Sequence, residues 1–69
     1  MSITILTQKE FPKIEKIKKE FNVFRVLHIT KGNLKMVEFF NTDGAFRGFG
    51  RNTKAAYKKA KRTLKKHYS

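Results

Sequence analysis

The sequence contains no cysteine, and this absence limits both its chemistry and its expected surroundings. Without cysteine the chain can form neither a disulfide framework nor a thiolate metal site, which suits a reducing, cytoplasmic environment. No apolar run approaches the roughly 20 residues that a membrane-spanning helix needs. The first residues also lack the basic segment and apolar run of a signal peptide. We therefore expect a cytoplasmic protein that does not enter a membrane.

Acidic residues are scarce as well, with five Asp and Glu against 17 Lys and Arg, which gives a net charge of +12. The five acids show no spacing typical of a metal site or of a general acid and base pair. The sequence contains no HExxH motif, no phosphate-binding loop and no context typical of a catalytic serine or cysteine. We expect no enzyme activity, no cofactor and no metal. The acids are Glu10, Glu15, Glu20, Glu38 and Asp43.

The chain length of 69 residues predicts a single domain, residues 1–69. A domain of this length buries only about 60% of the surface of its unfolded chain, so its core is small. Seven phenylalanines and two tyrosines nevertheless favour a folded core over a disordered basic tail.

The segment from Gly44 to Ser69 contains nine of the basic residues and no acid. Asn52 or Thr53 can cap a helix there, because its side-chain oxygen accepts a hydrogen bond from a free N–H group of the first turn. Beyond Thr53 there is no glycine or proline, and steps of about 100° per residue separate two arcs of the predicted helix. One arc contains Ala56, Tyr57, Ala60, Thr63 and Leu64, and it continues with His67 and Tyr68. The other arc contains Lys54, Lys58, Lys59, Lys61, Arg62, Lys65 and Lys66.

A helix face with seven like charges and no acid three or four residues away repels itself. Charged faces are often only solvated, but they usually mix signs, and this pattern favours an external anion. We expect nucleic acid, RNA or DNA, as the partner of a monomer or weak homodimer. An acidic protein or a ribonucleoprotein is the alternative partner. The residues expected to contact phosphates are Arg47, Arg51, Lys54, Lys58, Lys61, Arg62 and Lys65.

The remainder of the chain predicts one helix and several strands. Ser2–Leu6 is short and β-branched, which makes it a possible first strand. A helix is predicted at Pro12–Phe21, because Ile14, Ile17 and Phe21 share one face and proline suits the first helical position. Three further strands are predicted at Val23–Thr30, Leu34–Asn41 and Ala45–Phe49.

Short glycine-containing turns join these three strands, at Lys31-Gly32-Asn33 and Thr42-Asp43-Gly44, so an antiparallel meander is expected. The element order is (β)-α-β-β-β-α. The expected fold class is α+β: a small three-stranded antiparallel meander with two helices on one face. The other face of the sheet would expose an aromatic side chain or two, either as ordinary surface or as a stacking platform.

The topology of residues 12–66 resembles the double-stranded-RNA-binding domain (dsRBD). That family ends with a short strand, a Gly-x-Gly turn and a helix with regularly spaced alanines, and residues 48–64 carry this motif. The turn matches Gly48-Phe49-Gly50, and the helix positions match Ala56, Ala60 and Leu64. The resemblance implies a dsRBD-like fold that binds duplex or structured RNA.

The same resemblance implies that the start of the last helix contacts phosphates across the major groove of A-form RNA. Lys54 lies at one lysine of the family's basic cluster. Thr53 and Tyr57 occupy the other two lysine positions, and Asn52 replaces the family's serine. Cations further along the helix would then take over part of this contact.

Other families share parts of this outline. Integrase arm-binding and ethylene-response-type DNA-binding domains are similar in their three strands and helix, and they insert the sheet into the major groove. That resemblance would give more weight to Arg25, Lys35 and Arg47. Ribosome hibernation factors are similar in element order and in their basic last helix.

Two further alternatives concern enzymatic and protein-binding functions. Small toxin ribonucleases of the HicA type resemble the fold and use a histidine on the first strand of the meander, where this chain has His28. A structural histidine is the simpler interpretation of that residue. The protein-binding alternative is a regulator of the phage or mobile-element type that inhibits a host protein or an RNA-containing complex.

Overall fold

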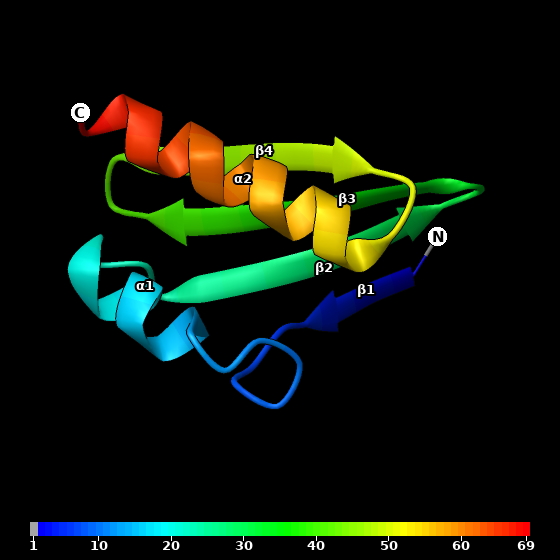
Figure 1. Ribbon diagram of the computed structural model, residues 1–69, viewed down its shortest axis with the longest axis horizontal. Helices are drawn as coiled ribbons and strands as arrows, with labels where there is room; N and C mark the ends of the chain where they lie inside the picture. The colour runs from blue at the N-terminus through cyan, green and yellow to red at the C-terminus, as the bar shows by residue number, and fades with distance from the viewer. Residues whose placement is uncertain (1) are drawn as a thin grey trace.

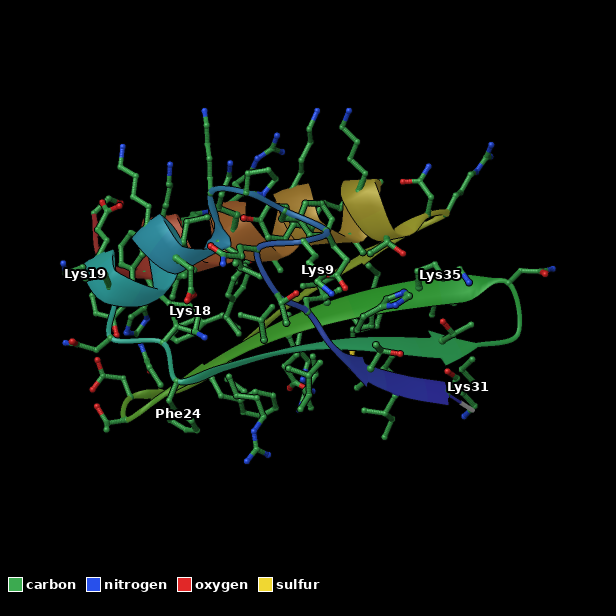
Figure 2. All side chains as sticks on the ribbon, turned by 90° about the horizontal axis from the view of Figure 1, so that it is seen from below. Lys9, Lys18, Lys19, Phe24, Lys31 and Lys35 are labelled. Carbon is green, nitrogen blue, oxygen red and sulfur yellow. The ribbon has the colours of Figure 1, made fainter. Side chains whose placement is uncertain are left out.

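The computed structural model describes residues 2–69 and shows an α+β fold with the element order β-α-β-β-β-α (Figure 1). Its four strands form one antiparallel sheet in the order β1-β2-β3-β4. Both helices lie on the same side of this sheet (Figures 1 and 2). The elements are β1 (Ser2–Ile5), α1 (Ile14–Glu20), β2 (Arg25–Lys31), β3 (Leu34–Asn41), β4 (Gly44–Gly50) and α2 (Thr53–His67).

The prediction of a three-stranded sheet was wrong by one strand. Residues Ser2–Ile5 pair antiparallel with β2, with Ile3 opposite Ile29 and Ile5 opposite Leu27. The long connection through α1 returns the chain antiparallel to β1, which makes β1 the outer neighbour of the meander. The meander of β2, β3 and β4 itself is confirmed.

The first helix is shorter than predicted at both ends. It begins at Ile14 rather than at Pro12, and its N-cap residue makes no side-chain hydrogen bond. At its other end Asn22 takes a positive φ of 55°, and the amide of Val23 donates to the carbonyl of Lys18 at 2.8 Å. This turn places the start of β2 at Arg25, two residues later than predicted.

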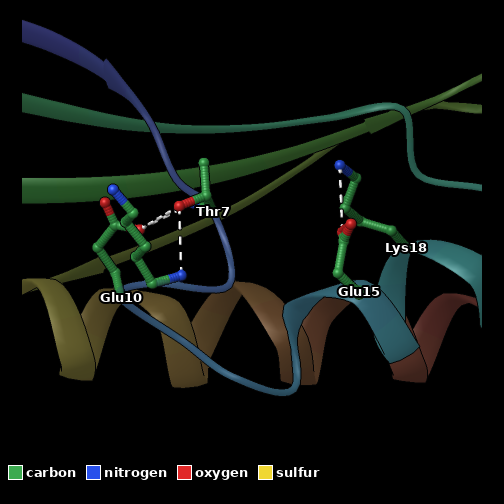
Figure 3. Close-up of polar contacts among 5 residues, drawn as sticks. Thr7, Glu10, Glu15 and Lys18 are labelled. Carbon is green, nitrogen blue, oxygen red and sulfur yellow. Dashed lines mark hydrogen bonds and ion pairs between the residues drawn. The ribbon is translucent and has the colours of Figure 1, made fainter.

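A tight turn before α1 is held by Thr7 and Glu10 (Figure 3). The carboxylate of Glu10 accepts hydrogen bonds from the amide of Thr7 at 3.0 Å and from its hydroxyl at 2.8 Å. These bonds lower the pKa of Glu10, because they favour the charged carboxylate. Thr7 and Glu10 have the spacing of a capping box, but Pro12 follows and the residues form a turn instead of a helix start.

One face of the sheet packs against the helices and forms the core. Val26, Phe39 and Phe46 lie opposite one another in a row across three strands, and all three are buried. The predicted apolar face of α1 is confirmed, since Ile14 and Ile17 are buried. The core consists of Leu6, Ile14, Ile17, Val23, Val26, Val37, Phe39, Phe46, Ala56, Tyr57, Ala60 and Leu64.

The glycines at the end of β4 allow α2 to approach the sheet closely. A Cβ on Gly48 would lie 2.1 Å from the backbone nitrogen of Ala60 and 2.6 Å from the carbonyl oxygen of Ala56. A Cβ on Gly50 would meet Ala55 and Ala56 at 2.8 Å. Gly48 and Phe49 thus belong to a strand, as predicted for Ala45–Phe49, and not to the turn that the dsRBD resemblance implies; Gly48 and Gly50 are required by helix packing.

The C-terminus is anchored to the β3–β4 turn. The hydroxyl of Tyr68 donates a hydrogen bond to the carboxylate of Asp43, and the side-chain amide of Asn41 donates to the same hydroxyl at 2.8 Å. Asn41 also donates to the carbonyl of Phe21 at 3.0 Å. This network satisfies the buried Asn41 side chain and joins the end of α2 to the segment after α1.

Candidate nucleic-acid interface

The second helix presents a cationic face to solvent because its other face is buried. Its N-cap is Asn52, one of the two residues predicted for this position. The side-chain oxygen of Asn52 accepts a hydrogen bond from the amide of Ala55 at 2.8 Å. Ala56, Tyr57, Ala60 and Leu64 are buried. Thr63 was predicted on the same arc but is exposed, and its hydroxyl donates to the carbonyl of Lys59 at 3.0 Å.

Six of the seven predicted phosphate-binding residues belong to this helical side of the molecule. Lys58, Lys61, Arg62 and Lys65 line one shallow surface groove along α2, together with Lys66 and Ser69. Lys54 is exposed in the first turn of α2, and Arg51 is exposed in the link before it.

Arg47 is the exception among the predicted residues. In β4, Phe46 and Gly48 face the helices, so the Arg47 side chain lies on the opposite face of the sheet. Its Nε donates to the carboxylate of Glu38 at 2.5 Å, and Glu38 is buried. This bond and the carboxylate charge raise the pKa of Arg47. The structure therefore separates Arg47 from the cations of α2.

The first helix brings additional cations to the same side. Lys13 and Lys61 line one groove between the start of α1 and the middle of α2, and Lys16, Lys19 and Lys65 line another. The sequence predicted only an apolar stripe on this helix and assigned no site to its lysines. Their position beside α2 depends on the packing of two helices far apart in the chain, and helical periodicity carries no signal of it.

The acids near α1 neutralise only part of this charge. The carboxylate of Glu15 lies 3.5 Å from the ammonium group of Lys18 within one turn of the helix (Figure 3). Such exposed pairs contribute little to stability because solvent screens them. Glu10 is engaged by Thr7, and Glu20 lies in the groove with Lys16, Lys19 and Lys65.

The electrostatic environment of Lys61 shows the effect of this crowding. Burial lowers the pKa of Lys61, and the charges of Lys65, Lys13 and Lys58 lower it further. Its ammonium group also lies 5.8 Å from the centre of the Tyr57 ring. Both helices thus impose a positive potential at this point, and a bound anion would relieve it.

The N-terminus of α2 adds to this positive potential. A helix N-terminus carries a partial positive charge, which acidic side chains in the first turn usually balance. The first turn of α2 contains no acid and instead carries Lys54. The helix therefore keeps an unfavourable concentration of positive charge at its start.

His28 belongs to β2, and its side chain lies next to Thr53 at the start of α2. The His28 Nε2 atom and the Thr53 hydroxyl oxygen are 3.1 Å apart, within hydrogen-bond distance. Burial lowers the pKa of His28, and the positive charge of Lys35 lowers it further, so both favour the neutral ring. Residues 2–69 contain no group of three or more His, Cys, Asp or Glu side chains that could hold a metal ion.

The three cations that a sheet-in-groove DNA-binding domain would use do not share one face. Lys35 lies opposite Thr30 on the helix side of the sheet and donates to the Thr30 hydroxyl at 3.4 Å. Arg25 and Arg47 lie on the other face, and Arg47 is engaged by Glu38. This placement does not favour the sheet as a DNA-reading surface.

No protein family, no curated protein and no solved structure matches this chain. Within residues 2–69, no helix is long and apolar enough to cross a membrane.

Proposed function

We propose that this protein is a small, non-enzymatic RNA-binding protein of the cytoplasm that contacts the phosphates of duplex or structured RNA through its two helices. The observation that carries this proposal is the convergence of α2 cations with two lysines of the first helix on one side of the fold. These residues are Lys58, Lys61, Arg62 and Lys65 of α2, Lys16 of α1 and Lys13, the N-cap residue of α1. No acid of α2 interrupts this surface.

Energetics supports an external anion as the partner of this surface. Lys58 has Lys54 and Arg62 four residues away on either side, and each like-charge pair of this kind destabilises a helix by about 0.2–0.5 kcal/mol. Phosphates compensate this repulsion directly, and the counterions released from RNA add a salt-dependent driving force. Contacts to phosphates position the protein on RNA but convey little sequence preference.

Structured RNA is favoured over DNA by the spread of the cations. They cover two helices instead of one narrow insertion element, and A-form RNA presents shape, phosphates and 2′-hydroxyl groups to such a surface. The resemblance of residues 48–64 to the dsRBD motif supports the same choice. Tyr57 and Thr53 stand at two of the family's lysine positions. Tyr57 is buried in the core and Thr53 lies within hydrogen-bond distance of His28. Lys58, Lys61 and Lys65 supply the phosphate contacts instead.

Paired charge reversal tests the location of the site. In the double variant Lys58→Glu and Arg62→Glu, both changed side chains are exposed, so we expect binding of a short RNA duplex to be abolished and the thermal melt by circular dichroism to be nearly unchanged. The matched control is Arg25→Glu with Lys31→Glu, which reverses two exposed cations of β2 on the other face of the sheet. Full retention of binding by the first variant, or equal loss in both, would contradict the helical site.

A further inference from the structure

The face of the sheet turned away from the helices is apolar, although nothing in residues 2–69 covers it. Ile3, Ile29, Met36 and Phe49 lie opposite one another in a continuous row across all four strands. In this row Ile3 is 58% exposed and Phe49 is 45% exposed. Strands with one solvated face normally alternate apolar and polar residues, so this composition departs from the usual pattern.

A second row beside the first adds two apolar residues and one ion pair to this face. It contains Ile5, which is 62% exposed, then Leu27, Glu38 and Arg47. Within residues 2–69, Glu38 is the only acid in the four strands, and it is buried under its ion pair with Arg47. The remaining guanidinium N–H groups of Arg47 face solvent, because the side chain is 61% exposed.

Exposed cations also flank this face of the sheet. Arg25 and Lys31 lie at the two ends of β2 on this side and are exposed. Figure 2 shows Lys31 and the exposed Phe24 on the side of the sheet away from the helices. An exposed apolar patch with a charged rim is typical of an interaction site.

We propose that this sheet face, centred on the row from Ile3 to Phe49, binds an apolar segment of a partner protein whose flanking residues are acidic. Aliphatic partner side chains match the Ile, Leu and Met side chains of the two rows, and carboxylates match Arg47, Arg25 and Lys31. The free N–H groups of Arg47 suit a carboxylate in particular, because a guanidinium binds one in a bidentate manner.

Charge and chemistry favour this occupant over two others. A second copy of the chain would bring two basic margins and two net charges of +12 together. Nucleic acid would need planar stacking partners, whereas the two rows are mainly aliphatic, with Phe49 inside them and the exposed Phe24 outside them. The sheet face and the helical RNA-binding face are on opposite sides, so the protein could hold an RNA and an acidic protein at once.

The test uses a synthetic amphipathic helical peptide with leucines on one face and glutamates along both margins. Methyl NMR spectra of the full chain should show peptide-dependent shifts of Ile3, Ile5, Leu27, Ile29 and Met36, and fluorescence anisotropy gives the affinity. The double variant Ile3→Thr and Phe49→Thr should weaken binding at least about tenfold, because it removes two exposed apolar anchors. A peptide with lysine in place of glutamate should bind more weakly than the acidic one.

Each opposing result identifies a different error. If the acidic peptide shifts none of these methyl groups at millimolar concentration, or binds the double variant equally well, the proposal is wrong. If a single-stranded RNA shifts them instead, the face is a base-stacking platform. Sedimentation velocity that shows a dimer, lost in the double variant, would assign the face to a second copy. The charge-reversal variant Lys58→Glu and Arg62→Glu, which changes only the helical face, should keep the peptide affinity.

Discussion

The ring of Phe11 stacks on the ring of Tyr57, with 3.9 Å between the ring centres and 8° between the ring planes. The contact joins the segment before α1 to the second turn of α2. Tyr57 is only 6% exposed, and burial raises the pKa of its hydroxyl. Within residues 2–69 the buried hydroxyl of Tyr57 has no hydrogen-bond partner.

Replacing Tyr57 with Phe should therefore not destabilise the protein. The change keeps the stacked ring and removes a buried polar group that lacks a partner, so the free energy of unfolding should stay equal or rise by up to about 1 kcal/mol. Urea unfolding followed by circular dichroism measures this difference. A loss of more than about 1 kcal/mol would show that the hydroxyl is hydrogen-bonded in solution, as to an ordered water.

Gly48→Ala should destabilise the fold strongly, because the added methyl group collides with the backbone of α2 at Ala60. Backbone cannot move aside as a flexible side chain can, so we expect a cost at or above about 3 kcal/mol, the upper end for overpacked cores. The matched control is Gly32→Ala, which has open space around its Cβ and a φ of +63°. Its positive φ alone should cost about 1 kcal/mol. Equal urea midpoints for the two variants would contradict the close approach of α2.

The pKa of His28 predicts a pH dependence of stability. Because folding lowers this pKa below the ordinary value of 6.5, the unfolded chain binds the proton more tightly than the folded chain. The contribution of His28 to the free energy of unfolding is therefore fully present above pH 6.5. It should be lost as the pH drops through the folded-state pKa of His28. Urea unfolding at several values between pH 5 and 7.5 measures this loss.

The variant His28→Gln serves as the control for that measurement. Glutamine keeps a polar group near Thr53 but does not titrate, so the loss of stability between pH 6.5 and 5 should become smaller. An unchanged pH dependence in the variant would assign the effect to another group. An NMR titration of the His28 ring should independently give a pKa below 6.5.

The lysines of α1 should contribute to RNA binding through charge alone. Removing Lys13 and Lys16 as Lys13→Gln and Lys16→Gln should flatten the slope of log K against log salt by about 1.4–1.8, since each lost phosphate contact removes roughly 0.7–0.9. The slope for the unchanged protein should be about −4 to −5 for six contacts. In the control Arg25→Gln with Lys31→Gln the slope should stay unchanged. A slope unaffected by the α1 variant would restrict the interface to α2.

The sequence predicts the local parts of this fold well. The periodicity of α2, its Asn52 cap and the buried Ala56, Ala60 and Leu64 follow from the 3.6-residue repeat and from capping chemistry. The meander follows from short strands separated by Gly32 and Gly44, which take the positive φ that such turns need. These features depend on neighbours in the chain, and so the sequence shows them directly.

The features that the sequence did not predict are non-local. The pairing of β1 with β2 requires a contact across the whole of α1, which a four-residue segment does not reveal. The position of Arg47 depends on which strand face meets the helices and on the distant Glu38. The α1 lysines join the candidate interface only through helix–helix packing. The sequence predicted an exposed aromatic side chain or two on the outer sheet face, but the continuous apolar row there emerges only when four strands are aligned.

A competition titration most directly tests the central claim that the helical face binds structured RNA. Equal lengths of duplex RNA, duplex DNA and single-stranded RNA compete for the protein at two salt concentrations. We predict a clear preference for duplex RNA that persists at the higher salt and is absent in the Lys58→Glu and Arg62→Glu variant. Equal and steeply salt-sensitive binding to all three would contradict the claim and show that the charge of +12 acts only as a general attraction for polyanions.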